Sequence, residues 1–160
     1  MAGYVLSCCS VCDLSREWLE QRDIHYIYFN YQLNGMQCKD DFGATCSPAD
    51  LYARMLAGDE VKTSQVSVGE YMNDWRPILE EGKDILHICM GSGISGTYSS
   101  ACMARDSIAR EFGDRKVIVI DSTTASSGLG LLMDKLADLR DEGMSLEDLA
   151  AWTEAHKAEM

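Results

Sequence analysis

The stretch ILHICMGSGISGTYSSA, residues 85–101, decides the fold of this chain. Its first part, Ile85 to Cys89, is a short apolar run that predicts a strand. The glycine-rich turn Gly91–Gly96 follows it. Beyond the turn, small and apolar residues recur at helical spacing as far as Phe112. A strand, a tight turn and a helix in this order predict one unit of a parallel sheet.

Towards the N-terminus, strand and helix patterns alternate in the same way. Tyr4–Leu6 has the composition of a short buried strand, and a helix is expected from Ser15 to about Arg22. Aromatic and β-branched residues fill Tyr26–Leu33, which predicts another strand. The dipeptide Asn34-Gly35 after it is a strong signal for a hairpin turn.

The next segment carries two helix start signals. Ser47-Pro48 places a capping residue before a proline, and we expect a helix from there through Leu56. Gly58–Gln65 is polar and predicts a loop. Ser67 is followed three residues later by Glu70, which predicts a capping box at the start of another helix.

Towards the C-terminus, Val117–Ile120 is apolar throughout, as expected of a strand at the centre of a parallel sheet. Helices are expected over Ser127–Glu142 and from Ser145 to near the end, where Ser145 and Asp148 predict a second capping box. The whole pattern predicts a three-layer, Rossmann-like α/β fold, with a mainly parallel sheet and helices on both faces. Residues 1–160 are expected to form a single domain.

Small polar side chains gather where the predicted strands end. They lie at Ser7–Ser10, Gly91–Thr97 and Asp121–Ser127, and the predicted loop Lys62–Gln65 forms a fourth cluster. In such sheets, ligands bind outside the carboxyl ends of the strands. These clusters are rich in hydrogen-bond donors and poor in titratable groups. The pattern favours binding an anion over breaking a bond, so we expect no enzyme activity.

The overall charge excludes some classes of partner. The chain has 14 basic and 26 acidic residues and a net charge of −12. Nucleic acids and anionic membranes select basic surfaces, so neither is an expected partner. No apolar run approaches the ~18 residues that membrane insertion requires, and no signal peptide is apparent. We therefore expect a cytoplasmic protein.

The seven cysteines are odd in number and irregularly spaced. In a chain without an export signal, this pattern predicts reduced thiols. Cys9-x-x-Cys12 is the one redox-like or metal-like pair, but no second pair lies at ligand spacing and no histidine is adjacent. We expect no metal and no cofactor, and we expect the oxidation state of the cysteines not to affect ligand binding.

An alternative function rests on the turn Gly91–Gly96, which matches G-x-G-x-x-G between a strand and a helix. Asp121 ends the next strand, as in the fingerprint of dinucleotide-binding proteins. That fingerprint normally occupies the first strand–helix turn, however, and several elements precede it here. A nucleotide or phosphate site therefore remains an alternative, as does an interaction domain with a vestigial site.

Four motifs resemble those of the DegV family and stand in the family's order. They are Ser10-Val11-Cys12-Asp13-Leu14, Thr63-Ser64-Gln65, Ile94-Ser95-Gly96-Thr97-Tyr98-Ser99-Ser100-Ala101, and Val119-Ile120-Asp121-Ser122 with Gly128-Leu129-Gly130. The resemblance covers almost the whole chain. The Ser-Gly-Thr-Tyr element together with the Thr-Ser-Gln segment is specific, whereas either alone would be a weak signal.

The resemblance implies a bacterial lipid-binding protein of the EDD fold. Members of the family bind a long-chain fatty acid between two lobes, and many present it to a fatty acid kinase. Carried over to this chain, the hydroxyls of Thr63 and Ser95 would hold the carboxylate. Ser95 lies at a predicted helix N-terminus, where N–H groups favour an anion. Supporting roles would fall to Ser10, Ser64, Gly96, Thr97, Asp121 and Ser122.

Two features depart from the family pattern. The family's first strand usually ends in an acidic residue before its serine, whereas Cys9 stands there in this chain. Family members also continue into a second, C-terminal lobe, whereas this chain stops at Met160 in a predicted helix. We therefore expect a domain fragment that corresponds to the N-terminal lobe alone.

Overall fold

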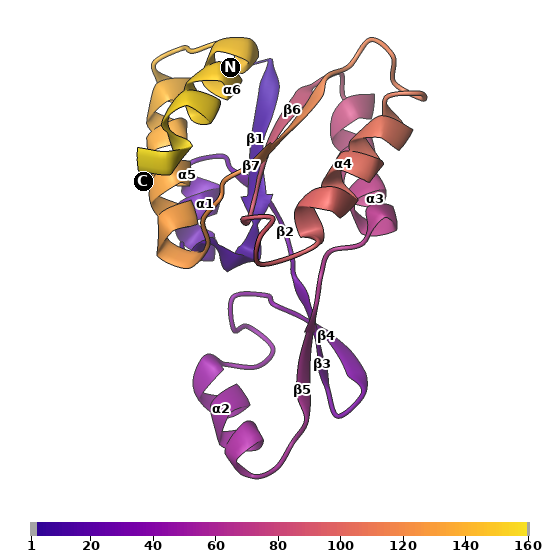
Figure 1. The fold of residues 1–160 in the computed structure, drawn as a ribbon, viewed down its shortest axis with the longest axis vertical. Coiled ribbons are helices and arrows are strands. Elements are labelled where there is room, and N and C mark those ends of the chain that lie inside the picture. Colours follow the sequence, from indigo (N-terminus) through magenta and orange to yellow (C-terminus); the bar gives the residue numbers. More distant parts are fainter. Residues whose placement is uncertain (1–2, 160) are drawn as a thin grey trace.

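The computed structural model describes residues 3–159 and contains two β-sheets. The main sheet has four parallel strands in the order β2-β1-β6-β7 (Figure 1). Their bounds are β1 (Tyr4–Cys9), β2 (His25–Ile27), β6 (Asp84–Cys89) and β7 (Val117–Asp121). The predicted α/β fold with a mainly parallel sheet is confirmed.

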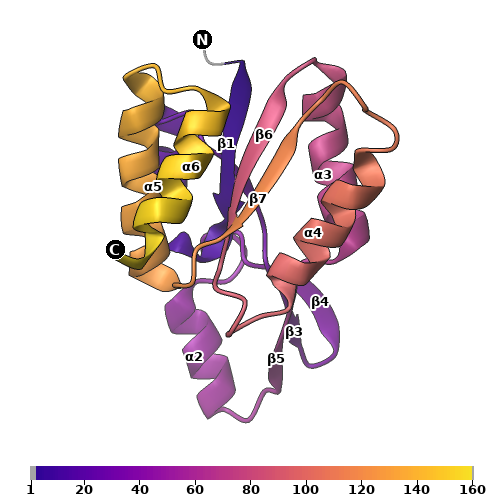
Figure 2. The ribbon, with the colours of Figure 1, turned by 45° about the horizontal axis from the view of Figure 1, so that its top comes forward.

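Helices cover both faces of the main sheet (Figure 2). One face carries α1 (Arg16–Gln21), α5 (Ser126–Asp141) and α6 (Leu146–His156). The other face carries α3 (Val68–Glu80) and α4 (Thr97–Ile108). Short 3₁₀ turns follow β1 and α6, at Ser10–Cys12 and Lys157–Glu159. The expected three layers are therefore present.

Serine caps fix where several helices begin. At Ser67 both bonds of the predicted capping box form with Glu70, and Ser47 caps α2 (Pro48–Leu56) as expected. Ser145 accepts the Asp148 N–H, but the Asp148 carboxylate bonds the Ser145 hydroxyl. The cap predicted at Ser145 is therefore confirmed. The predicted capping box is not, because the Asp148 carboxylate accepts from the Ser145 hydroxyl and not from the Ser145 backbone N–H.

Two hydrophobic cores hold the layers together. Beneath α5 and α6, the buried side chains include Leu6, Leu86 and Leu132. Beneath α3 and α4, Trp75 and Ile85 are fully buried. Because each core touches one face of the same sheet, the main strands are apolar on both faces, as parallel strands generally are.

The second sheet is small and antiparallel, and it lies beyond the carboxyl end of the main sheet (Figure 1). Its strands are β3 (Asn30–Leu33), β4 (Met36–Lys39) and β5 (Val61–Ser64), in the order β4-β3-β5. Asn34 and Gly35 form the predicted hairpin turn between β3 and β4, with φ of 52° and 79°. The helix α2 lies in the connection between β4 and β5.

The prediction of one strand over Tyr26–Leu33 was wrong, because the segment divides between the two sheets. Tyr28 and Phe29 separate β2 from β3. The Phe29 N–H donates to the Ser10 hydroxyl and its carbonyl accepts from the Asp40 N–H. These bonds take the Phe29 backbone out of the parallel ladder, so the chain leaves the main sheet there.

Two further predictions need correction. Gly58–Gln65 is not a loop throughout, because Val61–Ser64 pairs with β3 as an edge strand. The strand is largely exposed to solvent, so its residues are polar. Its composition is therefore similar to that of a loop. Val117–Ile120 is a strand, but it lies at the edge of the main sheet and not at its centre. Helices α4 and α6 cover its two faces, which accounts for its apolar composition.

Candidate ligand site at the carboxyl edge of the main sheet

The loops after β6 and β7 are fastened together at the carboxyl edge of the main sheet. The Gly91 N–H donates to the Thr124 carbonyl at 2.7 Å. A Cβ on Gly91 would lie 3.0–3.2 Å from the backbone of Thr123 and Thr124, so the two loops meet this closely only because residue 91 is glycine.

Asp121 reinforces this connection. One carboxylate oxygen accepts the N–H of Ser92 at 3.1 Å and the N–H of Thr123 at 2.9 Å. Burial acts to raise the pKa of Asp121, but hydrogen bonds from Ser92 and Thr123 outweigh it, and the pKa lies below its ordinary value. Ser122 is buried, and its hydroxyl bonds the Thr124 backbone. Both residues therefore shape the loop.

The same bonds disfavour the nucleotide alternative. A pyrophosphate needs free backbone N–H groups in the glycine turn. Here the Ser92 N–H is taken by the Asp121 carboxylate, and the N–H groups of Gly91 and Ile94 are taken by backbone carbonyls. A bound phosphate would also lie beside the negative charge of Asp121, which repels it.

Ser95 lies just before α4, at the helix N-terminus. Its hydroxyl accepts the Thr97 N–H at 3.2 Å and lies 2.8 Å from the Thr97 hydroxyl. Ser95 is half-buried, whereas Thr97 is fully buried. When Thr97 donates to Ser95, the Ser95 proton is left to donate to a ligand. The position combines a hydroxyl donor with the positive end of a helix dipole.

The Thr-Ser-Gln segment is anchored beside this helix N-terminus by Gln65. A Cβ on Gly96 would lie 2.1 Å from the Gln65 side-chain oxygen, so the amide occupies the space that a side chain at 96 would need. The Gln65 amide nitrogen donates to the Ser100 hydroxyl at 3.0 Å. The sequence analysis placed Gln65 in the Thr-Ser-Gln motif but assigned it no role. Gly96, in the neighbouring motif, was the signal that could have indicated this contact.

Thr63 and Ser64 precede Gln65 on β5. Thr63 is opposite Tyr31 and exposed, and Ser64 is opposite Asn30 and half-buried. Gln65 thus brings the end of β5 to the first turn of α4. That Thr63 and Ser95 converge on one carboxylate stays a prediction.

Ser10 joins the two sheets. Its hydroxyl donates to the Asp40 carboxylate at 2.9 Å and accepts the Phe29 N–H at 3.1 Å. Ser10 is buried, at the point where β1 ends. Asp40 directly follows β4, so this one hydroxyl contacts the segments on both sides of the β3–β4 hairpin. In the structure its role is to hold the small sheet against the main sheet.

Asp13 and Ser126 join another pair of segments. The Ser126 hydroxyl donates to the Asp13 carboxylate, and both residues have positive φ, of 55° and 56°. Non-glycine residues adopt this conformation infrequently. Because both partners of this hydrogen bond adopt it, the backbone is constrained where the two segments meet. Sequence reasoning did not identify this pair, which connects the loop after β1 to the start of α5.

A buried polar cluster lies under α3. The Ser7 hydroxyl is 2.9 Å from His87 Nδ1, and His87 Nε2 is 3.3 Å from the Tyr71 hydroxyl. Cys9 and Cys89 both approach the same hydroxyl, at 3.4 and 3.9 Å. Burial lowers the pKa of His87 to about 3, so its ring is neutral at physiological pH. Fully enclosed side chains of this kind support the strand and do not reach a ligand.

The one redox-like spacing in the sequence, Cys9-x-x-Cys12, does not bring its two cysteines into one core. Cys9 belongs to the core beneath α3 and α4, whereas Cys12 belongs to the core beneath α5. The sulfur of Cys12 instead lies 3.9 Å from that of Cys8. Among residues 3–159, no group of three or more histidine, cysteine or acidic side chains is placed to hold a metal ion.

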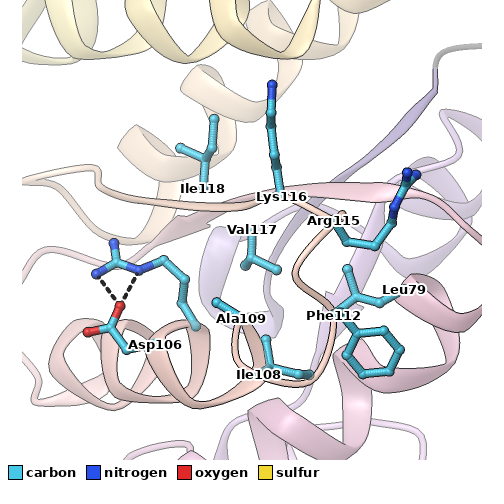
Figure 3. Close-up of a pocket in the computed structure, with 10 residues that line it drawn as sticks. Leu79, Asp106, Ile108, Ala109, Phe112, Arg115, Lys116, Val117 and Ile118 are labelled. Atoms are coloured by element: carbon cyan, nitrogen blue, oxygen red, sulfur yellow. Dashed lines mark hydrogen bonds and ion pairs between the residues drawn. The ribbon is translucent and has the colours of Figure 1, made fainter.

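Two surface clefts lie at the opposite, amino edge of the main sheet. One of about 280 Å³ is bordered by the start of β7 and the C-terminal part of α4 (Figure 3). Figure 3 shows Lys116 and Ile118 extending to the other side of β7 from Val117. The second, of about 980 Å³, surrounds Tyr4 and Arg140. Neither cleft is lined by Thr63 or Ser95.

Apolar side chains share a face of the small sheet with Thr63. Cross-strand partners in an antiparallel sheet point to the same side. The register therefore places on this face Tyr31, Leu33, Met36, Cys38, Val61 and Thr63. Nearby in the chain, α2 has no buried residue, and Leu56 is 91% exposed. The face of the small sheet that carries Thr63 is thus mostly apolar. Its apolar side chains range from Leu33, which is buried, to Met36, which is exposed.

Comparison with known proteins agrees with these motifs. A family model for the DegV family, described as uncharacterised proteins, matches residues 9–160. This chain belongs to the DegV family. A DegV domain-containing protein of Staphylococcus aureus is 34% identical over 141 residues, which cover 88% of this chain and 48% of that protein. The chain spans about half the length of the curated relatives it matches.

Solved DegV structures are also similar to the chain. The stearic-acid-binding protein of Eubacterium ventriosum has 28% identity and a TM-score of 0.85, over 95% of this chain and 52% of that one. The fatty acid kinase B3 protein of Streptococcus pneumoniae, loaded with linoleic acid, shares the fold with 24% identity and a TM-score of 0.80. That match covers 99% of this chain and 55% of the other. Within the described residues, no helix has the length and apolarity needed to cross a bilayer.

Proposed function

We propose that this DegV chain binds the carboxylate of a long-chain fatty acid through the hydroxyls of Thr63 and Ser95. The observation that carries the proposal is the contact between Gln65 and Gly96. It fastens the end of β5, with Thr63, to the N-terminus of α4, with Ser95. These two segments are the most specific motifs of the family, and they meet at the carboxyl edge where α/β sheets bind ligands.

The chemistry of the segment suits a carboxylate. Ser95 offers a hydroxyl at the positive end of α4, and Thr63 offers a second hydroxyl from an exposed position on β5. Hydrogen bonds from neutral donors stabilise an anion when they are fixed in position, so no lysine is required. The apolar face of the small sheet around Thr63 supplies a surface for the first part of an acyl chain.

The proposed role is that of a carrier without bond chemistry of its own. His87 is neutral and enclosed, and Asp121 is committed to backbone N–H groups. We further propose that the protein is cytoplasmic and presents its fatty acid to a fatty acid kinase. The second part is motivated by the description of the Streptococcus pneumoniae relative as a fatty acid kinase B3 protein loaded with linoleic acid.

A titration of the chain with a long-chain fatty acid tests the proposal. Two-dimensional NMR should show shifts at the amides of Thr63, Ser95, Gly96 and Thr97, because these surround the proposed carboxylate. The methyl ester of the same fatty acid is the matched control, since it keeps the tail and lacks the anion. Equal shifts with the ester, or shifts with NAD and none with the fatty acid, would refute the proposal.

A further inference from the structure

Cys8 and Cys12 form a close pair of buried thiols, with their sulfur atoms 3.9 Å apart. Both side chains are fully buried beneath α5. Cys8 belongs to β1, whereas Cys12 ends the 3₁₀ turn Ser10–Cys12. A disulfide needs sulfur atoms about 2.05 Å apart, so a movement of roughly 1.9 Å would join them.

The segment between these cysteines joins the two sheets. Ser10 lies at its centre, and its hydroxyl bonds both Phe29 and Asp40. β1 is held by β2 on one side and β6 on the other, so Cys8 has little freedom. The 3₁₀ turn is less regular, with φ and ψ of −82° and 26° at Val11. Backbone movement on closing the pair is therefore expected in the turn, and it would carry the Ser10 hydroxyl with it.

The two thiols are not equivalent. A hydrogen bond from Cys8 lowers the pKa of Cys12, assisted by the Leu14 N–H and opposed by burial. The same contact, together with burial, raises the pKa of Cys8. The thiolate is the reactive form of cysteine, so Cys12 is the nucleophile and Cys8 the resolving thiol.

We propose that Cys8 and Cys12 are a modification site, which a peroxide converts to a disulfide that repositions the small sheet. The Cys12 sulfur attacks one oxygen of hydrogen peroxide, the O–O bond breaks, and a sulfenic acid and one water form. The Cys8 sulfur then attacks the sulfenic sulfur, the S–O bond breaks, and a second water leaves with the Cys8 proton. Two thiols lose two electrons in total, and the peroxide gains them.

The movement reaches the candidate ligand site through two contacts. The Cys12 carbonyl packs against Gly130 of α5, where a Cβ would lie only 2.3 Å from it, so the turn cannot move towards that helix. The turn must instead move with Ser10, and with it the ends of the β3–β4 hairpin. Since Thr63 pairs with β3, oxidation changes its position relative to Ser95, contrary to the expectation from the sequence that cysteine oxidation does not affect ligand binding. This consequence for the ligand rests on the proposed function, whereas the disulfide itself does not.

The test uses the full chain with Cys38, Cys46 and Cys102 changed to serine, because these are the cysteines that are not fully buried. Hydrogen peroxide is added to the folded protein, free thiols are blocked, and peptides are mapped by mass spectrometry. We expect a loss of two hydrogen atoms, located in a Cys8–Cys12 disulfide and reversed by dithiothreitol. Cys8→Ala and Cys12→Ala should each abolish it.

Amide hydrogen exchange gives the structural readout. Oxidation should change exchange in peptides covering residues 28–42 and 61–66, and leave the α6 peptide 146–156 unchanged. A Cys9–Cys89 disulfide, or no disulfide at all, overturns the proposal. A Cys8–Cys12 disulfide without altered exchange in the small sheet overturns the coupling. Neither readout uses a fatty acid, so both can succeed even if the proposed function fails. The NMR titration with a fatty acid tests ligand binding separately.

Discussion

The side chain of Gln65 occupies the space in which a side chain on Gly96 would have to lie. The Gln65 oxygen is 2.1 Å from the ideal Cβ position, and its nitrogen bonds Ser100 on the next turn of α4. A strand of the small sheet is thereby fixed to a helix of the main sheet by one amide. The glycine of the Ser-Gly-Thr motif is therefore explained by the glutamine of the Thr-Ser-Gln motif.

Gly96→Ala should displace Gln65 and separate the two motifs. The backbone at Gly96 has φ of −70°, which alanine adopts without strain, and Gln65 can rotate away. We therefore expect a loss of only about 1 kcal/mol in the free energy of unfolding, from the Gln65–Ser100 bond. The NMR shifts induced by a fatty acid should nevertheless decrease strongly. Gly93→Ala is the control, because no atom lies within 4 Å of its Cβ position.

Thr63→Ala and Ser95→Ala should each weaken fatty-acid binding by about 1.5–3 kcal/mol, the usual contribution of a hydrogen bond to a charged group. The two losses should be non-additive, because both hydroxyls are proposed to bond one carboxylate. Calorimetry is best done in a protein that includes a second lobe, since binding by this chain alone is expected to be weak. Ser107→Ala is the matched control on α4, where the hydroxyl bonds only the Met103 carbonyl. Additive losses would exclude a shared carboxylate.

Gly91→Ala should destabilise the fold far more than Gly93→Ala, although both lie in one turn. The new methyl group would press on the backbone of Thr123 and Thr124, neither of which can rotate away. Overpacking of this kind costs about 1–3 kcal/mol. Urea unfolding of the two variants measures the difference. Equal midpoints would mean that the loops after β6 and β7 are not packed as described.

His87 should make the protein lose stability on mild acidification. Its pKa falls to about 3 in the folded state, so the unfolded chain takes up a proton near pH 6.5 that the folded chain does not. Its contribution to stability is therefore present above pH 6.5 and is lost as the pH falls from 6.5 towards 3. Between pH 7 and pH 5 the loss is about 2 kcal/mol.

The matched variant for this test changes His25 and His156 to glutamine, which leaves His87 as the remaining histidine of the three. Urea unfolding at pH 7, 6 and 5 should still show the loss in this variant. If the free energy of unfolding of this variant stays constant between pH 7 and pH 5, His87 is not the cause of the acid sensitivity.

Local signals predicted the main sheet and its helices well. The Ser67–Glu70 box, the Ser47 cap and the Asn34-Gly35 turn all formed where expected, because each depends on neighbours in the sequence. The division of the segment His25–Leu33 into two strands of different sheets could not be predicted from neighbouring residues. It depends on the Ser10 hydroxyl, which comes from a distant part of the chain.

The candidate site was predicted in part. The strand ends and hydroxyl clusters were visible in the sequence, and the family motifs named Thr63 and Ser95. Asp121 and Ser122 bond the backbone of the loops after β6 and β7, and their support of a ligand stays a prediction. The roles of Gln65, Asp13 and Ser126 depend on contacts between segments far apart in the sequence, and hydrogen bonds of that kind leave no periodic pattern to detect.

The edge position of β7 has a consequence for handling the protein. Val117–Ile120 is a run of four β-branched residues, and among the described residues no strand pairs with its outer side. Such an edge is a template on which another chain can add a strand. Only the charges of Lys116 and Asp121, at the two ends of the run, oppose that addition as gatekeepers. Aggregation of the chain is therefore expected to start at this edge.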